Sequence, residues 1–179
     1  MKLGSLFSGF GGLDLAVESV FGAKTVWVSD IEPGPRKVLA HRYPDVPNLG
    51  DITRIDWRNV EPVDIISGGS PCQDISAAGR MAGMRAGTRS NLWVEMREAI
   101  RALQPAYVIW ENVYAARSTA AASAMESDPR LLGDHPNGQP VLRALGRVLG
   151  DLASLGFDAE WHSLRAADVG APHGRARYF

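Results

Sequence analysis

The chain has 179 residues, of which 45% are hydrophobic and 22% are charged, and its net charge is −1 at pH 7. This composition predicts one globular domain with a substantial core, covering residues 1–179. The near-neutral charge argues against a broad basic surface for duplex nucleic acid. A single cysteine excludes an internal disulfide and a cysteine-rich zinc site. No apolar run approaches the ~20 residues that span a bilayer. The start of the chain is too short and too broken by glycine for a signal peptide, so we expect a cytoplasmic protein without a membrane partner.

The chain begins with a predicted strand, a glycine turn and a helix. Leu3–Phe7 is predicted to be the strand, glycines follow at 9, 11 and 12, and apolar residues then recur at helical spacing from Leu13 to Val20. Such a unit presents backbone N–H groups and a helix N-terminus to a ligand. The dinucleotide fingerprint Gly-x-Gly-x-x-Gly is not matched, because Asp14 holds the third glycine position. The turn is therefore either a tight connection or part of a nucleotide-like cofactor site.

A second predicted strand, Thr25–Ser29, ends at an acid, Asp30. An acid placed about 20 residues after a glycine turn is where such folds hold ribose hydroxyl groups. The alternative is that Asp30 caps a helix or lies in an exposed loop. A short helix is expected from Pro33 onward, and the loop after it carries a further acid at Asp51.

The third predicted strand, Val63–Ile66, leads through glycines into Ser70-Pro71-Cys72. This places a lone thiol at the carboxyl edge of a sheet, where α/β proteins bind their ligands. The alternative is a small buried hydrophobic residue, which is the usual role of a free cysteine. Three glycines and flanking arginines between Ala77 and Arg89 indicate a basic loop, either a lid or an ordinary surface connection.

In the second half, an apolar stripe from Leu92 to Leu103 predicts a helix, and Tyr107–Trp110 predicts a buried strand that ends at Glu111. Glu111 would then lie at the same edge of the sheet as the cysteine. For residues 115–139 the sequence predicts an insertion or a long loop with about one helical turn. A helix over Val141–Leu152, a strand over Ala159–Leu164, and a final loop entering a strand complete the expected order.

Four of these segments, in this order, resemble motifs of the DNA (cytosine-5)-methyltransferase family. They are Phe7-Ser8-Gly9-Phe10-Gly11-Gly12-Leu13, Gly69-Ser70-Pro71-Cys72-Gln73-Asp74-Ile75-Ser76, Glu111-Asn112-Val113 and the segment from Gly170 to Arg177. The chain departs from the family pattern at Ser70 and Ile75, where proline and phenylalanine are common, and at His173, where glutamine is usual. The resemblance implies a Rossmann-like α/β fold with a doubly wound, mostly parallel sheet that binds S-adenosylmethionine.

The resemblance also assigns residues to the cofactor. Asp30 would hold the ribose, and Asp51 with Ile52 would meet the adenine. The full set of positions expected to line the cofactor is Phe7, Gly9, Gly11, Gly12, Leu13, Asp30, Ile31, Asp51, Ile52, Pro71 and Leu92. No metal ion is implied.

For the reaction, the resemblance makes Cys72 the nucleophile that adds to C6 of cytosine, which turns C5 into an enamine-like carbon. Its pKa must be lowered by nearby positive charge, for which Arg175 and Arg177 are the candidates. Glu111, if protonated, can donate to N3, and an arginine of the pair can hold O2. The target base lies inside the duplex stack and has to be flipped out. The role of His173 is left open.

Family members usually continue with a target-recognition region and a final segment that completes the catalytic domain, so the resemblance covers a catalytic domain without its last strands. Double-stranded DNA is the expected substrate, and a second polypeptide is a possible partner, as in DNA modification linked to restriction. Three alternatives stay open: a catalytically incomplete cofactor-binding fragment, a tRNA cytosine-5-methyltransferase, and a nicotinamide oxidoreductase, against which the Asp14 mismatch argues.

Overall fold

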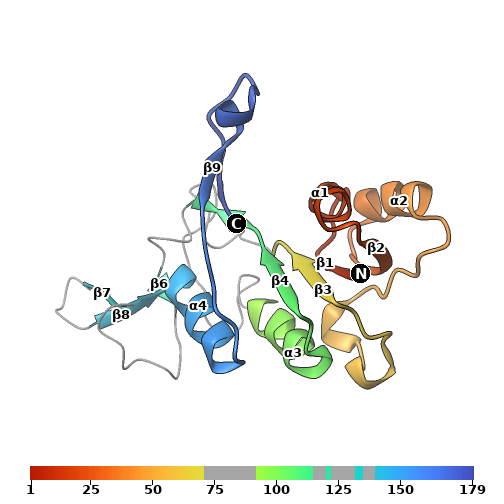
Figure 1. Ribbon diagram of the computed structural model, residues 1–179, viewed down its shortest axis with the longest axis horizontal. Helices are drawn as coiled ribbons and strands as arrows, with labels where there is room; N and C mark the ends of the chain where they lie inside the picture. Colours follow the sequence, from red (N-terminus) through yellow and green to blue (C-terminus); the bar gives the residue numbers. More distant parts are fainter. Residues whose placement is uncertain (71–91, 115–119, 122–131, 135–139) are drawn as a thin grey trace. The chain divides into compact units, whose positions relative to one another are not determined.

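The computed structural model describes residues 1–70, 92–114, 120–121, 132–134 and 140–179 (Figure 1). These residues belong to two compact units, which are described separately. The first unit comprises Met1–Ser70 and Val94–Trp110, and the second comprises the described residues of 71–93 and Glu111–Phe179. No helix in these described ranges is long and apolar enough to cross a membrane.

The first unit is built on a four-stranded parallel sheet with the order β2-β1-β3-β4. Its strands are β1 (Lys2–Leu6), β2 (Lys24–Ser29), β3 (Ile65–Gly68) and β4 (Tyr107–Trp110). The chain passes from β1 to β2 on one side and then returns to β3 on the other. The strand order therefore reverses between β1 and β3, and ligands of such sheets bind at the carboxyl ends of the strands beside this reversal.

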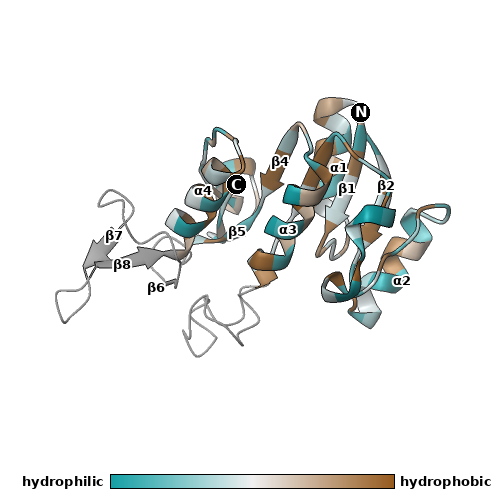
Figure 2. Cartoon of the chain, turned by 90° about the horizontal axis from the view of Figure 1, so that it is seen from below, coloured by the Kyte–Doolittle hydropathy of each residue, from teal (hydrophilic) through white to brown (hydrophobic). Residues whose placement is uncertain are grey.

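Helices cover both faces of this sheet. They are α1 (Gly12–Phe21), α2 (Pro33–Arg42) and α3 (Trp93–Leu103), with short 3-10 turns at Ile52–Arg54 and Trp57–Asn59. Figure 1 shows α1 and α3 on opposite sides of the strands, as right-handed crossovers require when strands are added on both sides of β1. Figure 2 shows hydrophobic and hydrophilic residues on α3, whose Met96, Ala99 and Ile100 are fully buried, whereas α2 buries only Leu39. The predicted doubly wound parallel α/β fold is confirmed.

The third strand extends further toward the cysteine segment than the apolar run predicts. Ile65 and Ile66 are fully buried, and pairing with β1 and β4 continues through Ser67 and Gly68. A Cβ at Gly68 would lie 2.8 Å from the carbonyl oxygen of Leu6. Only glycine allows this close approach, which explains why a glycine stands inside a buried strand.

The second unit contains antiparallel pairing. One sheet has the order β5-β10-β9 and the other has the order β6-β8-β7. The strands are β5 (Asn112–Val113), β6 (Ala120–Ala121), β7 (Leu132–Asp134), β8 (Pro140–Arg143), β9 (Ser163–Arg165) and β10 (Ala176–Tyr178). A helix, α4 (Ala144–Ser154), follows β8, and a 3-10 turn at Ala166–Val169 joins β9 to β10.

Three expectations need correction in this unit. The helix predicted from Val141 begins at Ala144, because residues 140–143 pair on both sides as β8. The predicted loop over 115–139 contains two short strands, β6 and β7, among its described residues, and the rest of it lies outside the described part of the chain. The strand predicted over Ala159–Leu164 is shifted to Ser163–Arg165, where β10 supplies its hydrogen bonds.

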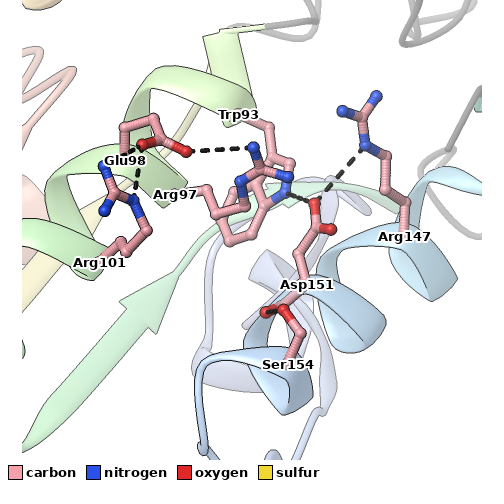
Figure 3. A network of polar contacts seen from close by, with 7 residues as sticks. All are labelled: Trp93, Arg97, Glu98, Arg101, Arg147, Asp151 and Ser154. Carbon is pink, nitrogen blue, oxygen red and sulfur yellow. Dashed lines mark hydrogen bonds and ion pairs between the residues drawn. The ribbon is translucent and has the colours of Figure 1, made fainter. Parts of the chain in front are cut away.

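A buried polar contact anchors α4 within the second unit (Figure 3). The indole N–H of Trp93 donates to Oδ2 of Asp151 at 2.7 Å, and Nε of Arg147 lies 3.6 Å from the same oxygen. The hydroxyl of Ser154 donates to the Asp151 carbonyl at 2.6 Å. Trp93 directly follows Leu92, so this contact fixes the chain next to one of the predicted cofactor positions.

Candidate active site

The glycine turn after β1 holds residues in the left-handed region of backbone space. Gly9 has φ 55° and Gly11, the N-cap of α1, has φ 77°, while Phe7 adopts φ 52° although it is not glycine. Such strained non-glycine residues concentrate at functional sites. No side chain caps the N-terminus of α1, and a Cβ added at Gly12 would meet nothing within 4 Å. The turn therefore leaves uncapped N–H groups beside open space, which suits an anionic ligand group.

Asp30 follows the last residue of β2, as predicted, and its carboxylate organises the glycine turn. Oδ2 accepts the backbone N–H of Gly9 at 2.8 Å, and Oδ1 accepts that of Glu32 at 2.8 Å. Each carboxylate oxygen can accept a further hydrogen bond, so a ribose diol can still donate to this group. Ile31 beside it exposes its side chain. Asp30 thus has a structural role in the turn and retains the capacity for the predicted role in cofactor binding.

Asp51 caps the 3-10 turn at Ile52–Arg54. Its Oδ1 accepts the backbone N–H of Thr53 at 3.0 Å and the Thr53 hydroxyl at 2.8 Å. These hydrogen bonds hold the pKa of Asp51 below its ordinary value. The Ile52 side chain is buried in the core of the first unit. Both residues lie in the first unit with the glycine turn, and their contact with an adenine stays a prediction.

The carboxyl ends of β3 and β4 are joined by a hydrogen bond between side chains. The indole N–H of Trp110 donates to Oγ of Ser70 at 3.2 Å, and both residues are buried, with 7% and 2% of their surface exposed. Gly68 and Trp110 are also register partners in the sheet. Glu111 directly follows Trp110. Cys72 lies two residues after Ser70, a span of at most ~7 Å of extended chain. Pro71 and Cys72 themselves lie outside the described residues.

Glu111 and Arg177 form an ion pair, with Nε of Arg177 2.7 Å from Oε1 of Glu111. The pair is partly buried, with 29% of the Glu111 side chain and 21% of the Arg177 side chain exposed. Arg177 comes into place because β10 pairs with β5 at Val113. Burial raises the pKa of Glu111 above its ordinary value, although the charges of Arg177 and Arg175 act in the opposite direction. A carboxyl with a raised pKa is suited to donating a proton near neutral pH.

The remaining predicted residues of the second unit are more exposed. Arg175 is exposed, and its backbone N–H donates to Nδ1 of His173 at 3.4 Å. This contact makes Nδ1 of His173 an acceptor, so the imidazole stabilises the turn before Arg175. Leu92 is partly buried and precedes Trp93. Among the described residues there is no group of three or more His, Cys, Asp or Glu side chains that could hold a metal ion.

Two features of the site were not anticipated from the sequence. One is the Ser70–Trp110 hydrogen bond, for which no local pattern exists. The other is Asp14, which is buried and accepts a hydrogen bond from the hydroxyl of Ser67 at 2.8 Å. The sequence does show that Asp14 replaces the third glycine of the dinucleotide fingerprint. Its burial could not be predicted from this mismatch, because burial depends on the strands that pack against α1.

The whole chain, residues 1–179, matches the family model described as C-5 cytosine-specific DNA methylase. The chain belongs to this family. It is 32% identical over 184 residues to the Type II methyltransferase M.NlaIV of Neisseria lactamica, covering 100% of this chain and 40% of that protein. It is 35% identical over 153 residues to a protein of Escherichia phage P1 named DNA N-6-adenine-methyltransferase, covering 74% of this chain and 20% of that protein.

A crystal structure of a DNA modification methyltransferase encoded within an E. coli prophage shares the fold, with a TM-score of 0.67 at 22% identity. That likeness covers 99% of this chain and 45% of the other. Members of this family use S-adenosylmethionine as their cofactor. The uncapped helix N-terminus, the open glycine turn and the acid at the end of β2 fit its carboxylate and its ribose.

Proposed function

We propose that this chain is the part of a DNA (cytosine-5)-methyltransferase that binds the cofactor and carries the nucleophile, and that it methylates C5 of a flipped-out cytosine through a covalent bond between Cys72 and C6. The main support is the Ser70–Trp110 hydrogen bond. It ties together the two strand ends from which the Cys72 segment and Glu111 follow. The family's nucleophile and its proton donor therefore begin from one bonded pair of residues.

In the proposed reaction, the Cys72 thiolate forms a bond to C6, and the electron pair of the C5–C6 double bond moves toward N3 and O2. Glu111 donates its proton to N3, for which its raised pKa is suited. S-adenosylmethionine, when bound, would supply the electrophilic methyl group that the enamine-like C5 takes up, with the C–S electron pair staying on the cofactor's sulfur. Water takes the C5 proton, the electron pair of that C–H bond restores the C5–C6 double bond as the C6–S bond to Cys72 breaks, and N3 returns its proton to Glu111.

Arg177 holds Glu111 in place through their ion pair. Arg175 has no hydrogen bond or ion pair from its guanidinium within the described residues and is the first candidate to hold O2 of the cytosine, while Arg177 retains donors for the same purpose. Since the chain spans 40% of the length of M.NlaIV, we propose that sequence readout and much of the phosphate contact come from a further polypeptide region. That region is either a continuation of the same chain or a second chain. The expected setting is the cytoplasm of a bacterial or phage-infected cell, in DNA modification linked to restriction.

Trapping of the covalent intermediate tests this proposal. DNA in which 5-fluorocytosine replaces the target base blocks the final elimination, so an active enzyme accumulates a denaturant-resistant adduct. We expect such an adduct when the chain, S-adenosylmethionine and a partner region from a family member are combined, and we expect Cys72→Ser to abolish it. An adduct that persists in Cys72→Ser would exclude the proposed nucleophile.

Two other outcomes identify the alternatives. Cofactor binding without adduct formation, for any DNA and partner region tried, would identify a cofactor-binding fragment. An adduct formed with 5-fluorocytosine in tRNA and never in DNA would identify the tRNA enzyme.

A further inference from the structure

Asp14 is a buried acid that the proposed reaction does not use. It lies in the first turn of α1 and exposes only 1% of its surface. Its Oδ1 accepts the Ser67 hydroxyl at 2.8 Å, whereas Oδ2 has no hydrogen-bond partner among the described residues. Within the described residues, no ion pair joins Asp14 to a cation. Burying an unsatisfied carboxylate oxygen costs free energy, and such a group calls for an explanation.

The neighbours of Asp14 place it at the reversal of strand order. Ser67 belongs to β3, and its register partner in β1 is Ser5. The Ser5 hydroxyl lies near Asp14 and donates to Oγ of Ser8 in the glycine turn at 2.8 Å. The carboxylate therefore lies between the strand that leads into the glycine turn and the strand that leads toward Cys72. Ligands of doubly wound sheets bind at the carboxyl ends of strands at this point.

The charge on Asp14 is weakly compensated. Burial raises the pKa of Asp14 above the ordinary value, and the nearby Ser5 hydroxyl and the hydrogen bond from Ser67 act in the opposite direction. The other charged groups that act on it are Glu18 on α1, which raises the pKa, and Arg42 on α2, which lowers it. Arg42 is exposed and uses Nη1 to donate to the carbonyl of Phe10 at 2.8 Å. The pKa of Tyr43, also near this group, is raised, mainly by burial and in part by the charge of Asp14.

We infer that Asp14 makes the cofactor site prefer the cationic methyl donor over its neutral product. This inference rests on the proposed function. S-adenosylmethionine carries a carboxylate, an ammonium and a sulfonium group, so its net charge is +1, whereas S-adenosylhomocysteine, which has a thioether, is neutral overall. A carboxylate in the protein interior attracts the cationic S-adenosylmethionine and has no net attraction for the neutral S-adenosylhomocysteine. Transfer of the methyl group removes this attraction and favours release of the product.

The size of the effect follows from the distance along the chain. The glycine turn ends at Gly12, two residues before Asp14, so a ligand held by the turn lies on the order of 10 Å from the carboxylate. At that distance and an effective dielectric constant of about 20, one charge pair changes an affinity by roughly tenfold. Substitution of Asp14 should therefore change the ratio of the two dissociation constants by roughly this factor.

Isothermal titration calorimetry of both ligands tests the inference with Asp14→Asn, which has nearly the same shape without the charge. We expect S-adenosylmethionine to bind Asp14→Asn roughly tenfold more weakly, and S-adenosylhomocysteine to bind both proteins equally within about twofold. Glu18→Gln is the matched control, because it removes the same charge one turn further along α1. Its effect on the ratio should be smaller.

The pH dependence gives a second readout that needs no variant. The preference of the wild-type chain for S-adenosylmethionine should decline as pH falls through the raised pKa of Asp14, and the preference of Asp14→Asn should not change over that range. Equal weakening of both ligands would show a structural role only, and an unchanged ratio would show that the charge is not felt at the site. If Asp14→Asn fails to fold, a wild-type preference that does not depend on pH still refutes the inference. Failure of wild-type protein to bind either ligand would count against the proposed function instead.

Discussion

Replacement of Trp110 by phenylalanine isolates the contact that joins the ends of β3 and β4. The substitution removes the indole N–H, which lies 3.2 Å from Oγ of Ser70, and leaves a buried ring position partly empty. Loss of a neutral hydrogen bond costs about 1 kcal/mol, and the smaller ring adds about 1–2 kcal/mol for lost packing. We therefore expect the free energy of unfolding to fall by about 2–3 kcal/mol in chemical denaturation.

The functional effect should exceed what this loss of stability explains. A displacement of about 1 Å between reacting groups can cost about 100-fold in rate. Trp110→Phe should therefore slow formation of the 5-fluorocytosine adduct by about 10- to 100-fold, while the dissociation constant of S-adenosylmethionine stays unchanged. Rates are measured below the onset of unfolding, so that folded protein is compared with folded protein.

Trp27→Phe is the matched control. Trp27 is also buried in the first unit and donates its indole N–H to the carbonyl of Glu61 at 2.9 Å. It should lose a similar amount of stability and keep the wild-type rate of adduct formation. Two results would show that the Ser70–Trp110 contact does not set the position of Cys72. Both variants could slow adduct formation equally, or Trp110→Phe could lose stability without any change in the rate of adduct formation.

Three further predictions concern protonation and packing. Glu111→Gln should slow adduct formation by about 10²–10⁴-fold, because glutamine cannot donate the proton. In pH–rate profiles, the wild-type rate should decline as pH rises through the raised pKa of Glu111, and the rate of Glu111→Gln should not show this decline. The pKa of Asp14 is higher in the folded than in the unfolded protein, so its contribution to stability is lost as pH rises from the unfolded to the folded pKa. Chemical denaturation across this pH range should therefore show Asp14→Asn gaining stability relative to the wild type. A stability difference that does not change with pH would contradict the raised pKa. Gly68→Ala would place a Cβ 2.8 Å from the Leu6 carbonyl oxygen and should cost about 1–3 kcal/mol. Gly34→Ala is the control, because nothing lies within 4 Å of the new Cβ in the first turn of α2, and it should change stability by less than about 1 kcal/mol in chemical denaturation.

Much of the first unit followed from local sequence. Apolar runs and glycine punctuation predicted β1, β2 and β4, and helical spacing predicted α1 and α3, because each pattern reports which face of a single element is buried. The positions of Asp30 and Glu111 at strand ends followed from the same reading. The motif resemblance then identified the family, and the family model over residues 1–179 confirmed it.

The tertiary structure decided what depends on pairing between distant segments. Val141 and Leu142 extend the apolar spacing of the following helix, but pairing with β6 and β7 makes residues 140–143 a strand. The raised pKa of Glu111 and its ion pair with Arg177 arise from the packing of β10 against β5. Asp14 was visible in the sequence only as a mismatch to a glycine fingerprint. Its burial against Ser67 gives that mismatch a physical meaning, because the energy of a carboxylate is set by the groups that surround it and those come from other strands.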